Sequence, residues 1–327
     1  MRPPHLSPDA SYTTLVGFLQ TLAKGSEGLP ADAPSLRRLH GLVAGLRPTP
    51  HQSPPPLPEV SLDRAVALVV AAHGLLPVLH DTGGASPLGA ETAQNLSETL
   101  RDLAVSLGAA LRRQQAHRVR GLYVIIDPQV TGGRDPLDIA AAAIRGGARM
   151  LQLRDKLRDK GQILPLAMAL QRLCQANDVL LIINDHVDLA AVVGAGGAHV
   201  GQTDLPVAQA RRVLAPHQVL GRSNREIDQI IQSQEMGADH VAFGAIYLTS
   251  TKTVVRSPQG IEPLRRARQA AKVPLVAIGG INAENVAPVV EAGADAICVT
   301  AAVGAAPDPE AAASRLVKAI RAAGGRV

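Results

Sequence analysis

The feature that most constrains this chain is an alternation of short β-branched runs with Ala- and Leu-rich segments, which begins near Gly121 and continues to the end. The runs have the length and composition of buried strands, and the segments between them have helical spacing. Eight strands are predicted, at Gly121–Asp127, Met150–Arg154, Val179–Asn184, Gly197–Gly201, Gln218–Arg222, His240–Gly244, Val273–Gly279 and Ala296–Thr300. Helices are predicted to begin near Asp135, Gly161, Val187, Pro206, Arg225, Gly260, Ala283 and Asp308.

Eight strand–helix units in the last 207 residues predict an α/β fold of the TIM (β/α)8 barrel type. The alternative is a doubly wound open sheet, which would carry a Gly-rich fingerprint after its first strand. Residues 127–133 do not have that glycine spacing, so the barrel is favoured.

Residues 1–118 differ in composition from the rest of the chain, because eleven of the 24 prolines fall within the first 60 positions. Four helical patterns lie around them, at 12–24, 35–46, 61–80 and 91–118, and the last has leucines at spacings of three and four. We therefore predict a small all-helical domain over 1–118, with a Pro-rich linker near 48–60, and a barrel domain over 119–327. The helical domain suits a structural or oligomerising role, with a ligand site as the alternative.

Composition excludes several classes of protein. Hydrophobic residues make up 46% of the chain and charged residues 19%, which excludes intrinsic disorder. Aromatic residues make up only 2%, too few for a base-stacking surface, so no nucleic-acid partner is expected. Residues 1–118 hold ten Lys and Arg against nine Asp and Glu, so most of the net charge of +5 belongs to the barrel. This excess favours a local anion site.

Two cysteines, Cys174 and Cys298, lie in apolar segments and are expected to be buried free thiols. The longest apolar run, Ala65–Leu79, is interrupted by His73 and Pro77 and is shorter than a membrane span. The first residues do not resemble a signal peptide. We expect a cytoplasmic protein with no membrane partner, and homo-oligomerisation is left open.

Polar residues gather where the predicted strands end, which is where TIM barrels build their sites. After the second strand, alternation sends Gln152, Arg154 and Lys156 to one side, giving two cations and an amide for an anionic ligand. A solvated charge run is the alternative.

Asp185 and Asp204 follow neighbouring strands and could share one hard cation. Mg²⁺ held by two carboxylates and substrate phosphate oxygens is the usual arrangement for such a pair. The alternative is that each aspartate caps the helix that follows it.

Hydroxyl and glycine residues form two further loops suited to phosphate. Ser223 follows the fifth strand, and Thr249, Ser250, Thr251 and Lys252 follow the sixth. Gly279 and Gly280 end the seventh strand and let a phosphate approach backbone N–H groups. Together with the acidic pair, these loops indicate two phosphorylated substrates at one barrel mouth.

These motifs, in this order, resemble the thiamine-phosphate synthase family over residues 121–327. The motifs that carry the resemblance are Gln152-Leu153-Arg154-Asp155-Lys156, Asn184-Asp185, Gly201-Gln202-x-Asp204, Ser223, Thr249-x-Thr251-Lys252 and Ile278-Gly279-Gly280-Ile281. The resemblance implies that hydroxymethylpyrimidine diphosphate and a carboxylated thiazole ethyl phosphate are joined. The products would be thiamine monophosphate, pyrophosphate and CO₂.

The same resemblance implies roles for individual residues. The pyrimidine diphosphate would be held by Gln152, Leu153, Arg154, Asp155, Lys156, Asn184, Ser223 and Lys252, and the thiazole phosphate by Thr249, Ser250, Thr251, Gly280, Thr300 and Ala301. Asp185 and Asp204 would hold Mg²⁺. Arg154, Lys156, Ser223 and Lys252 would act on the departing pyrophosphate, so that the reaction is a dissociative substitution without a protein nucleophile. Asn224-Arg225 stands where the family usually has Thr-His, and Thr300-Ala301 where it usually has Ile-Ser.

Three other functions are compatible with the pattern. A thiazole tautomerase of the same barrel family would need a histidine base, for which His186, His199 and His240 are the candidates. A Schiff-base aldolase would need Lys156 or Lys252 to be desolvated. A sensor of thiamine intermediates would need binding without turnover. The retained cations and carboxylates favour the synthase.

Overall fold

The structure is a computed structural model that describes residues 8–26, 29–31, 33–46, 60–80, 88–249 and 257–327. The chain forms two compact units, residues 1–112 and residues 113–327. The boundary between the units falls inside a helix, α4 (Ala90–Ala116), whose last residues belong to the second unit. Each unit has its own hydrophobic core.

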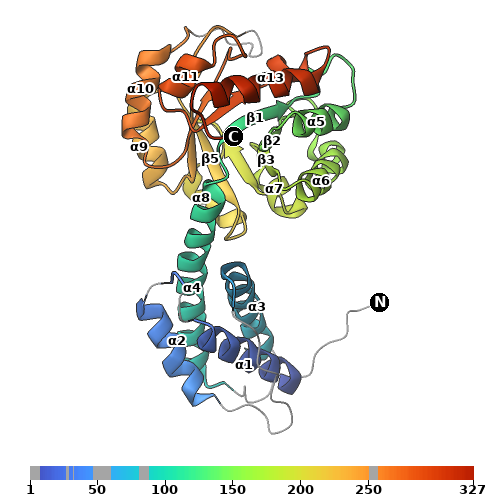
Figure 1. Ribbon diagram of the computed structural model, residues 1–327. Helices are drawn as coiled ribbons and strands as arrows, with labels where there is room; N and C mark the ends of the chain where they lie inside the picture. Colours follow the sequence, from blue (N-terminus) through green and yellow to red (C-terminus); the bar gives the residue numbers. More distant parts are fainter. Residues whose placement is uncertain (1–7, 27–28, 32, 47–59, 81–87, 250–256) are drawn as a thin grey trace. The chain divides into compact units, whose positions relative to one another are not determined.

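The first unit contains α1 (Pro8–Lys24), α2 (Ala33–Gly45), α3 (Leu62–His80) and most of α4 (Figure 1). The predicted leucine stripe of α4 forms part of its core, since Leu96, Leu100, Leu103 and Leu107 are fully buried. The Pro-rich linker predicted near 48–60 lies almost wholly outside the described residues. Pro77 lies inside α3 and does not end it. Among the described helices, α3 alone has the length and composition to cross a membrane, and about a third of Leu62–Leu79 is buried.

The second unit is a closed barrel of eight parallel strands in sequence order, which confirms the predicted fold. Figure 1 shows the strands at the centre and the helices outside them. The strands are β1 (Gly121–Ile126), β2 (Met150–Leu153), β3 (Leu180–Asn184), β4 (Gly197–Val200), β5 (Val219–Asn224), β6 (His240–Gly244), β7 (Leu275–Ile278) and β8 (Ala296–Val299). The helices are α5 (Pro136–Arg145), α6 (Lys160–Ala176), α7 (Val187–Val193), α8 (Val207–Val213), α9 (Ile227–Glu235), α10 (Ile261–Ala270), α11 (Ala287–Glu291), α12 (Ala301–Gly304) and α13 (Pro309–Ala322).

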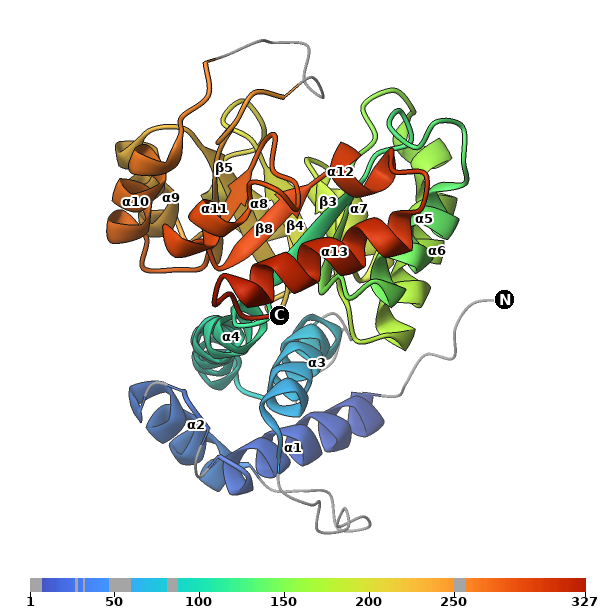
Figure 2. The same cartoon turned by 45° about the horizontal axis from the view of Figure 1, so that its top comes forward.

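Alternation along the strands sorts side chains into two cores. Tyr123 and Met150 point into the barrel, while their neighbours Leu122 and Leu151 pack between the sheet and the helices. The long helix α13 lies across β1 and beside α5 on the outside of the barrel (Figure 2). Because the side-chain period is two, the inward-facing positions at the carboxyl ends of the strands meet at one end of the barrel, which we call the mouth.

Three helices depart from the sequence prediction. The first helix was expected over 12–24, but α1 already begins at Pro8. The seventh helix was expected near Ala283, but α11 begins at Ala287. The side chain of Asn282 accepts hydrogen bonds from the N–H groups of Glu284 (3.0 Å) and Asn285 (3.1 Å), and this turn delays the helix. The four-residue helix α12 was not predicted, because a single helical turn leaves no periodic pattern.

Candidate active site at the barrel mouth

Arg154 and Asp127 form an ion pair at the mouth. Asp127 directly follows β1 and Arg154 directly follows β2, and the backbone N–H of Arg154 donates to the carbonyl of Ile126 at 3.0 Å. The guanidinium Nη1 of Arg154 donates to Oδ2 of Asp127, whose side chain is only 1% exposed. The predicted cation is therefore present at the mouth, but it has a buried partner that sequence reasoning missed.

The second predicted cation, Lys156, lies beside the predicted metal ligands. Its ammonium donates to Oδ2 of Asp185, which follows β3. Asp185 in turn hydrogen-bonds Asp204, which follows β4. The backbone N–H of Asp185 donates to the carbonyl of His199 at 2.8 Å, and Oδ2 of Asp204 accepts the N–H of Gly201 at 2.7 Å. Two carboxylates and an ammonium thus form one cluster.

The two carboxylates shift each other's pKa in opposite directions. Burial raises the pKa of Asp185; Lys156 lowers it, but the Asp204 carboxylate raises it, and the net direction is upward. Burial also raises the pKa of Asp204, but its bonds with Asp185 and the Gly201 N–H outweigh burial and hold it below its usual value. Of the two, Asp185 therefore binds a proton more readily and Asp204 ionises first.

Neither aspartate caps the helix that follows it. The N-cap of α7 is His186 and that of α8 is Pro206, and Asp204 turns back to Gly201 instead. Asp185 has φ of +61°, a left-handed conformation that a non-glycine residue adopts at an energetic cost. The helix-cap alternative is therefore excluded for both residues.

Among the described residues, no group of three or more His, Cys, Asp and Glu side chains could enclose a metal ion. Asp185 and Asp204 by themselves supply only part of a coordination shell. Mg²⁺ commonly binds in this way, through one or two carboxylates with the remaining positions filled by water and substrate phosphate oxygens.

Ser223 and His199 form a third part of the mouth. The Nε2 atom of His199 lies 2.9 Å from the Oγ of Ser223, and the Nε2 of Gln202 donates to the carbonyl of Ser223 at 2.6 Å. Beneath them His240 is fully buried, with its ring stacked 5.7 Å from that of His199. The three histidines named as candidate bases thus differ in place: His186 is the N-cap of α7, His240 is buried, and His199 contacts Ser223.

The other predicted binding residues differ in where their side chains point. Gln152 faces the barrel interior, where its Nε2 donates to the Tyr123 hydroxyl at 2.5 Å, and Asn184 stands opposite His199 in register. The side chain of Leu153 belongs to the outer core and points away from the mouth. Asp155 turns into its own loop, where it accepts the N–H groups of Leu157 and Arg158 at 3.1 Å and the Arg158 side chain at 2.5 Å.

The glycine turn after β7 is hydrogen-bonded to the connection that follows β6. The N–H of Tyr247 donates to the carbonyl of Gly279 at 2.9 Å, and Gly280 has φ of +66°. A Cβ on Gly280 would lie 2.3 Å from the carbonyl oxygen of Leu248, so only glycine fits. Thr249 is part-buried nearby in the chain, whereas Ser250, Thr251 and Lys252 lie outside the described residues.

At the end of β8, Thr300 is the N-cap of α12 and Ala301 is its first residue. The opposite end of α12 is held by Arg134, whose guanidinium donates to the carbonyls of Gly304 (2.8 Å) and Ala306 (2.7 Å). The loop between β1 and α5 is thereby joined to the C-terminal end of α12.

The unusual pair Asn224-Arg225 has a structural explanation. Asn224 is buried, and its side chain accepts a hydrogen bond from the Oγ of Ser233 at 2.7 Å. Arg225 donates to the carbonyl of Ser257 at 2.9 Å, and its own carbonyl accepts from the Nε2 of Gln259 at 3.0 Å. Arg225 thus joins the end of β5 to the segment that leads into α10.

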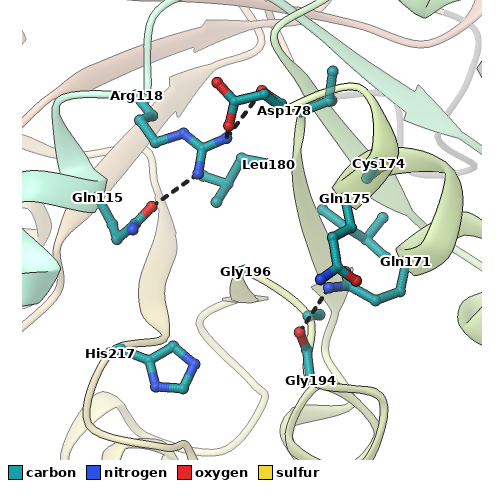
Figure 3. A pocket seen from close by; sticks show the side chains of 13 residues that line it. Gln115, Arg118, Gln171, Cys174, Gln175, Asp178, Leu180, Gly194, Gly196 and His217 are labelled. Carbon is teal, nitrogen blue, oxygen red and sulfur yellow. Dashed lines mark hydrogen bonds and ion pairs between the residues drawn. The ribbon is translucent and has the colours of Figure 1, made fainter. Parts of the chain in front are cut away.

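A separate hollow of about 220 Å³ opens at the other end of the barrel, where β3 and β4 begin. Figure 3 shows the guanidinium of Arg118 between Gln115 and Asp178, at 3.0 and 2.8 Å, and Gln171 bonded to the carbonyl of Gly194 at 2.8 Å. The charge of Arg118 is already neutralised by Asp178. None of the predicted site residues lines this hollow.

The family model described as thiamine monophosphate synthase matches residues 122–303. The chain belongs to the thiamine monophosphate synthase family. It is accordingly a transferase whose substrates are small molecules. The matched region begins at the first residues of β1 and ends in α12, so it contains every part of the mouth described above.

Individual members of the thiamine monophosphate synthase family are close in sequence. The chain is 43% identical over 211 residues to the thiamine-phosphate synthase of Albidiferax ferrireducens, covering 63% of this chain and 96% of that protein. It is 41% identical over 205 residues to that of Moorella thermoacetica, covering 63% and 98%. The solved thiamine phosphate pyrophosphorylase of Pyrococcus furiosus aligns with a TM-score of 0.59 and 30% identity, covering 64% of this chain and 99% of that one.

Proposed function

We propose that this chain joins hydroxymethylpyrimidine diphosphate to a carboxylated thiazole ethyl phosphate, giving thiamine monophosphate, pyrophosphate and CO₂. The observation that carries the proposal is the cluster of Lys156, Asp185 and Asp204 at the mouth of a barrel that belongs to this family. Arg154 directly follows β2, two positions before Lys156, and adds a second cation.

The chemistry of the donor set fits Mg²⁺ at Asp185 and Asp204. The charges of these two carboxylates repel each other, which raises the pKa of Asp185, and a cation between them would remove that repulsion. The Lys156 ammonium already occupies a cationic position against Asp185. When bound, Mg²⁺ would supply charge neutralisation for the diphosphate.

The residues of the mouth would act on the leaving group. Arg154 and Lys156, with Lys252 from the predicted loop, would neutralise the charge that grows on the diphosphate as the bond between the pyrimidine methylene carbon and oxygen breaks. The Ser223 hydroxyl, oriented by His199, would donate to or accept from the same substrate. The electron pair of the broken bond would leave with pyrophosphate.

The second substrate would be held by its phosphate at the Gly279-Gly280 turn, with Thr249, Ser250, Thr251, Thr300 and Ala301. Holding it there would present the thiazole nitrogen to the methylene cation, and its lone pair would form the new carbon–nitrogen bond. The carboxylate would then leave as CO₂, and the electron pair left on the ring carbon would take a proton from water.

The direct test mixes the purified chain with both substrates and Mg²⁺ and measures thiamine monophosphate as its fluorescent oxidation product, with and without a chelator. We expect product that the chelator abolishes. Folded protein that makes no product would contradict the proposal, and conversion of one thiazole isomer to another would identify the chain as a tautomerase instead. Binding of the substrates without either reaction would indicate a sensor.

A further inference from the structure

Asp127 is a buried carboxylate whose two oxygens both have partners. Its Oδ2 accepts from Arg154, and its Oδ1 accepts the backbone N–H of Gln129 at 3.0 Å. The side chain is 1% exposed, whereas that of Arg154 is 20% exposed. A carboxylate buried to this degree is stable only when a cation and hydrogen bonds compensate for its lost hydration.

Arg154 is therefore fixed at one end and open at the other. The ion pair uses only Nη1, and within the described parts of the chain neither Nε nor Nη2 donates a hydrogen bond. Neither of these nitrogens is among the buried atoms without a partner, and the Arg154 side chain is 20% exposed at the mouth. A planar guanidinium tethered at one nitrogen presents its other N–H groups in a fixed direction.

We infer that Asp127 is a positioning residue, which orients Arg154 so that the free edge of its guanidinium faces the diphosphate of the first substrate. This inference rests on the proposed function, because it assigns to Arg154 the substrate group named there. Asp127 itself does not touch the substrate; it acts through Arg154. The register supports this role, because both residues directly follow paired strands and the Arg154 N–H continues the ladder to Ile126.

Charge alone would give Asp127 the opposite effect. A negative charge next to the diphosphate site repels the ligand, so its removal would strengthen pyrophosphate binding if orientation did not matter. Loss of the tether would have the opposite effect on affinity. An untethered Arg154 side chain must be ordered when pyrophosphate binds, and the entropy lost in that ordering weakens binding. The sign of the change in pyrophosphate affinity therefore separates the two roles.

The experiment compares wild type with Asp127→Asn, which keeps the shape and an acceptor for the Gln129 N–H but removes the charge. We measure pyrophosphate binding with Mg²⁺ by calorimetry, and kcat and KM for thiamine monophosphate formation. We expect weaker pyrophosphate binding and a fall of about 10- to 100-fold in kcat/KM for the pyrimidine diphosphate. The KM for the thiazole phosphate should not change.

Two further variants make the result specific. In the Arg154→Ala background, Asp127→Asn should add no further loss, because a residue that acts through Arg154 has nothing left to position. Asp295→Asn is the matched control, since Asp295 pairs with Arg268 at 2.5 Å and accepts the Leu275 N–H at 2.9 Å, outside the mouth. This control should keep the pyrophosphate affinity and kcat/KM of wild type.

If Asp127→Asn does not fold, pyrophosphate binding is measured with Arg154→Lys instead. A lysine has one nitrogen, which Asp127 would hold, so this variant should bind pyrophosphate as weakly as Arg154→Ala. Tighter or unchanged pyrophosphate binding by Asp127→Asn, additive losses in the double variant, or wild-type binding by Arg154→Lys would each overturn the inference. Failure of the wild type to form product would instead contradict the proposed function.

Discussion

Asp185 and Asp204 hydrogen-bond to each other across the ends of β3 and β4, and their contact raises the pKa of Asp185 and lowers that of Asp204. The contact joins two strands that are neighbours in the barrel, and Lys156 from the end of β2 donates to the same cluster. Two ionised carboxylates this close repel each other, and a bound cation removes that repulsion.

We first expect Mg²⁺ to raise the thermal unfolding temperature of the wild type, because the ion binds the folded cluster and not the unfolded chain. Asp185→Asn and Asp204→Asn should each abolish this shift and lower turnover by about 100-fold or more. Asp295→Asn, which changes the ion pair with Arg268 just before β8 begins, should keep both. Differential scanning fluorimetry and the product assay measure the two quantities. A Mg²⁺ shift that survives in both cluster variants would place the ion elsewhere.

The same cluster should make Mg²⁺ binding depend on pH. The pKa of Asp185 is raised, so at acidic pH Asp185 takes up a proton that bound Mg²⁺ must displace. The affinity for Mg²⁺ should therefore increase as the pH rises through the range in which Asp185 loses its proton. Calorimetric titrations in buffers of different ionisation enthalpy measure the released proton. Binding that releases no proton at any acidic pH would contradict the raised pKa of Asp185.

His240 should control part of the acid stability of the barrel. Burial lowers its pKa to about 3, from an unperturbed value of 6.5, so between these values the unfolded chain binds a proton that the folded chain does not. Stability should thus fall as pH decreases below 6.5, by at most about 1.4 kcal/mol per pH unit from this group. His240→Leu should flatten this slope in urea unfolding experiments. Above pH 7 the free energies of unfolding of the two proteins should differ by a constant amount. If both proteins lose stability at the same rate below pH 6.5, His240 is not the group responsible.

Gly280 should be essential to the turn after β7. Gly280→Ala would place a Cβ 2.8 Å from the Cβ of Tyr247 as well as against Leu248, at a φ of +66°. The turn must move, so we expect the KM for the thiazole phosphate to rise by about tenfold or more. Gly324→Ala is the matched control, because its φ is +84° but nothing lies within 4 Å. It should lose about 1 kcal/mol of stability and keep the wild-type KM.

The end of α4 should stabilise the barrel. Arg118 donates to the carbonyl oxygen and the carboxylate of Asp178, at 2.9 and 2.8 Å, and Ala116 is buried. A fragment of residues 113–327 should therefore unfold at a higher temperature than a fragment of residues 119–327, because its free energy of unfolding is larger by about 1 kcal/mol. Both fragments should form product. Thermal unfolding and the product assay test this. Equal stability of the two fragments would show that this segment contributes nothing, and loss of activity in both would assign the first unit a part in catalysis.

Much of the mouth could be predicted because strand periodicity is local. Arg154 follows a strand in which Met150 and Gln152 face inward, so its inward direction can be counted along the chain. The same counting placed Asp185 and Asp204 at neighbouring strand ends. It could not separate a helix cap from a metal ligand, because both choices use the same aspartate at the same place in the chain.

Residues whose role depends on a distant partner were missed. Asp127 is a single aspartate after a strand, and only its ion pair with Arg154, 27 positions away, reveals what it does. His199 looked like a strand residue until the barrel brought its ring to Ser223, 24 positions away. Leu153 and Asp155 were wrongly expected at the mouth because they are neighbours of Arg154 in the chain. In the structure the Leu153 side chain packs in the outer core, and the Asp155 side chain turns into its own loop.

The eight-unit barrel, the family and the strand ends at which the chemistry gathers can all be predicted from the amino-acid sequence. They follow from period-two and period-3.6 patterns and from turn residues, which act over a few positions. Which charges are paired, which carboxyl has the raised pKa and which side chains face the mouth are known only from the folded barrel. Those properties depend on burial and on distances between segments that closure of the barrel brings together, because a charge responds to whatever surrounds it in space.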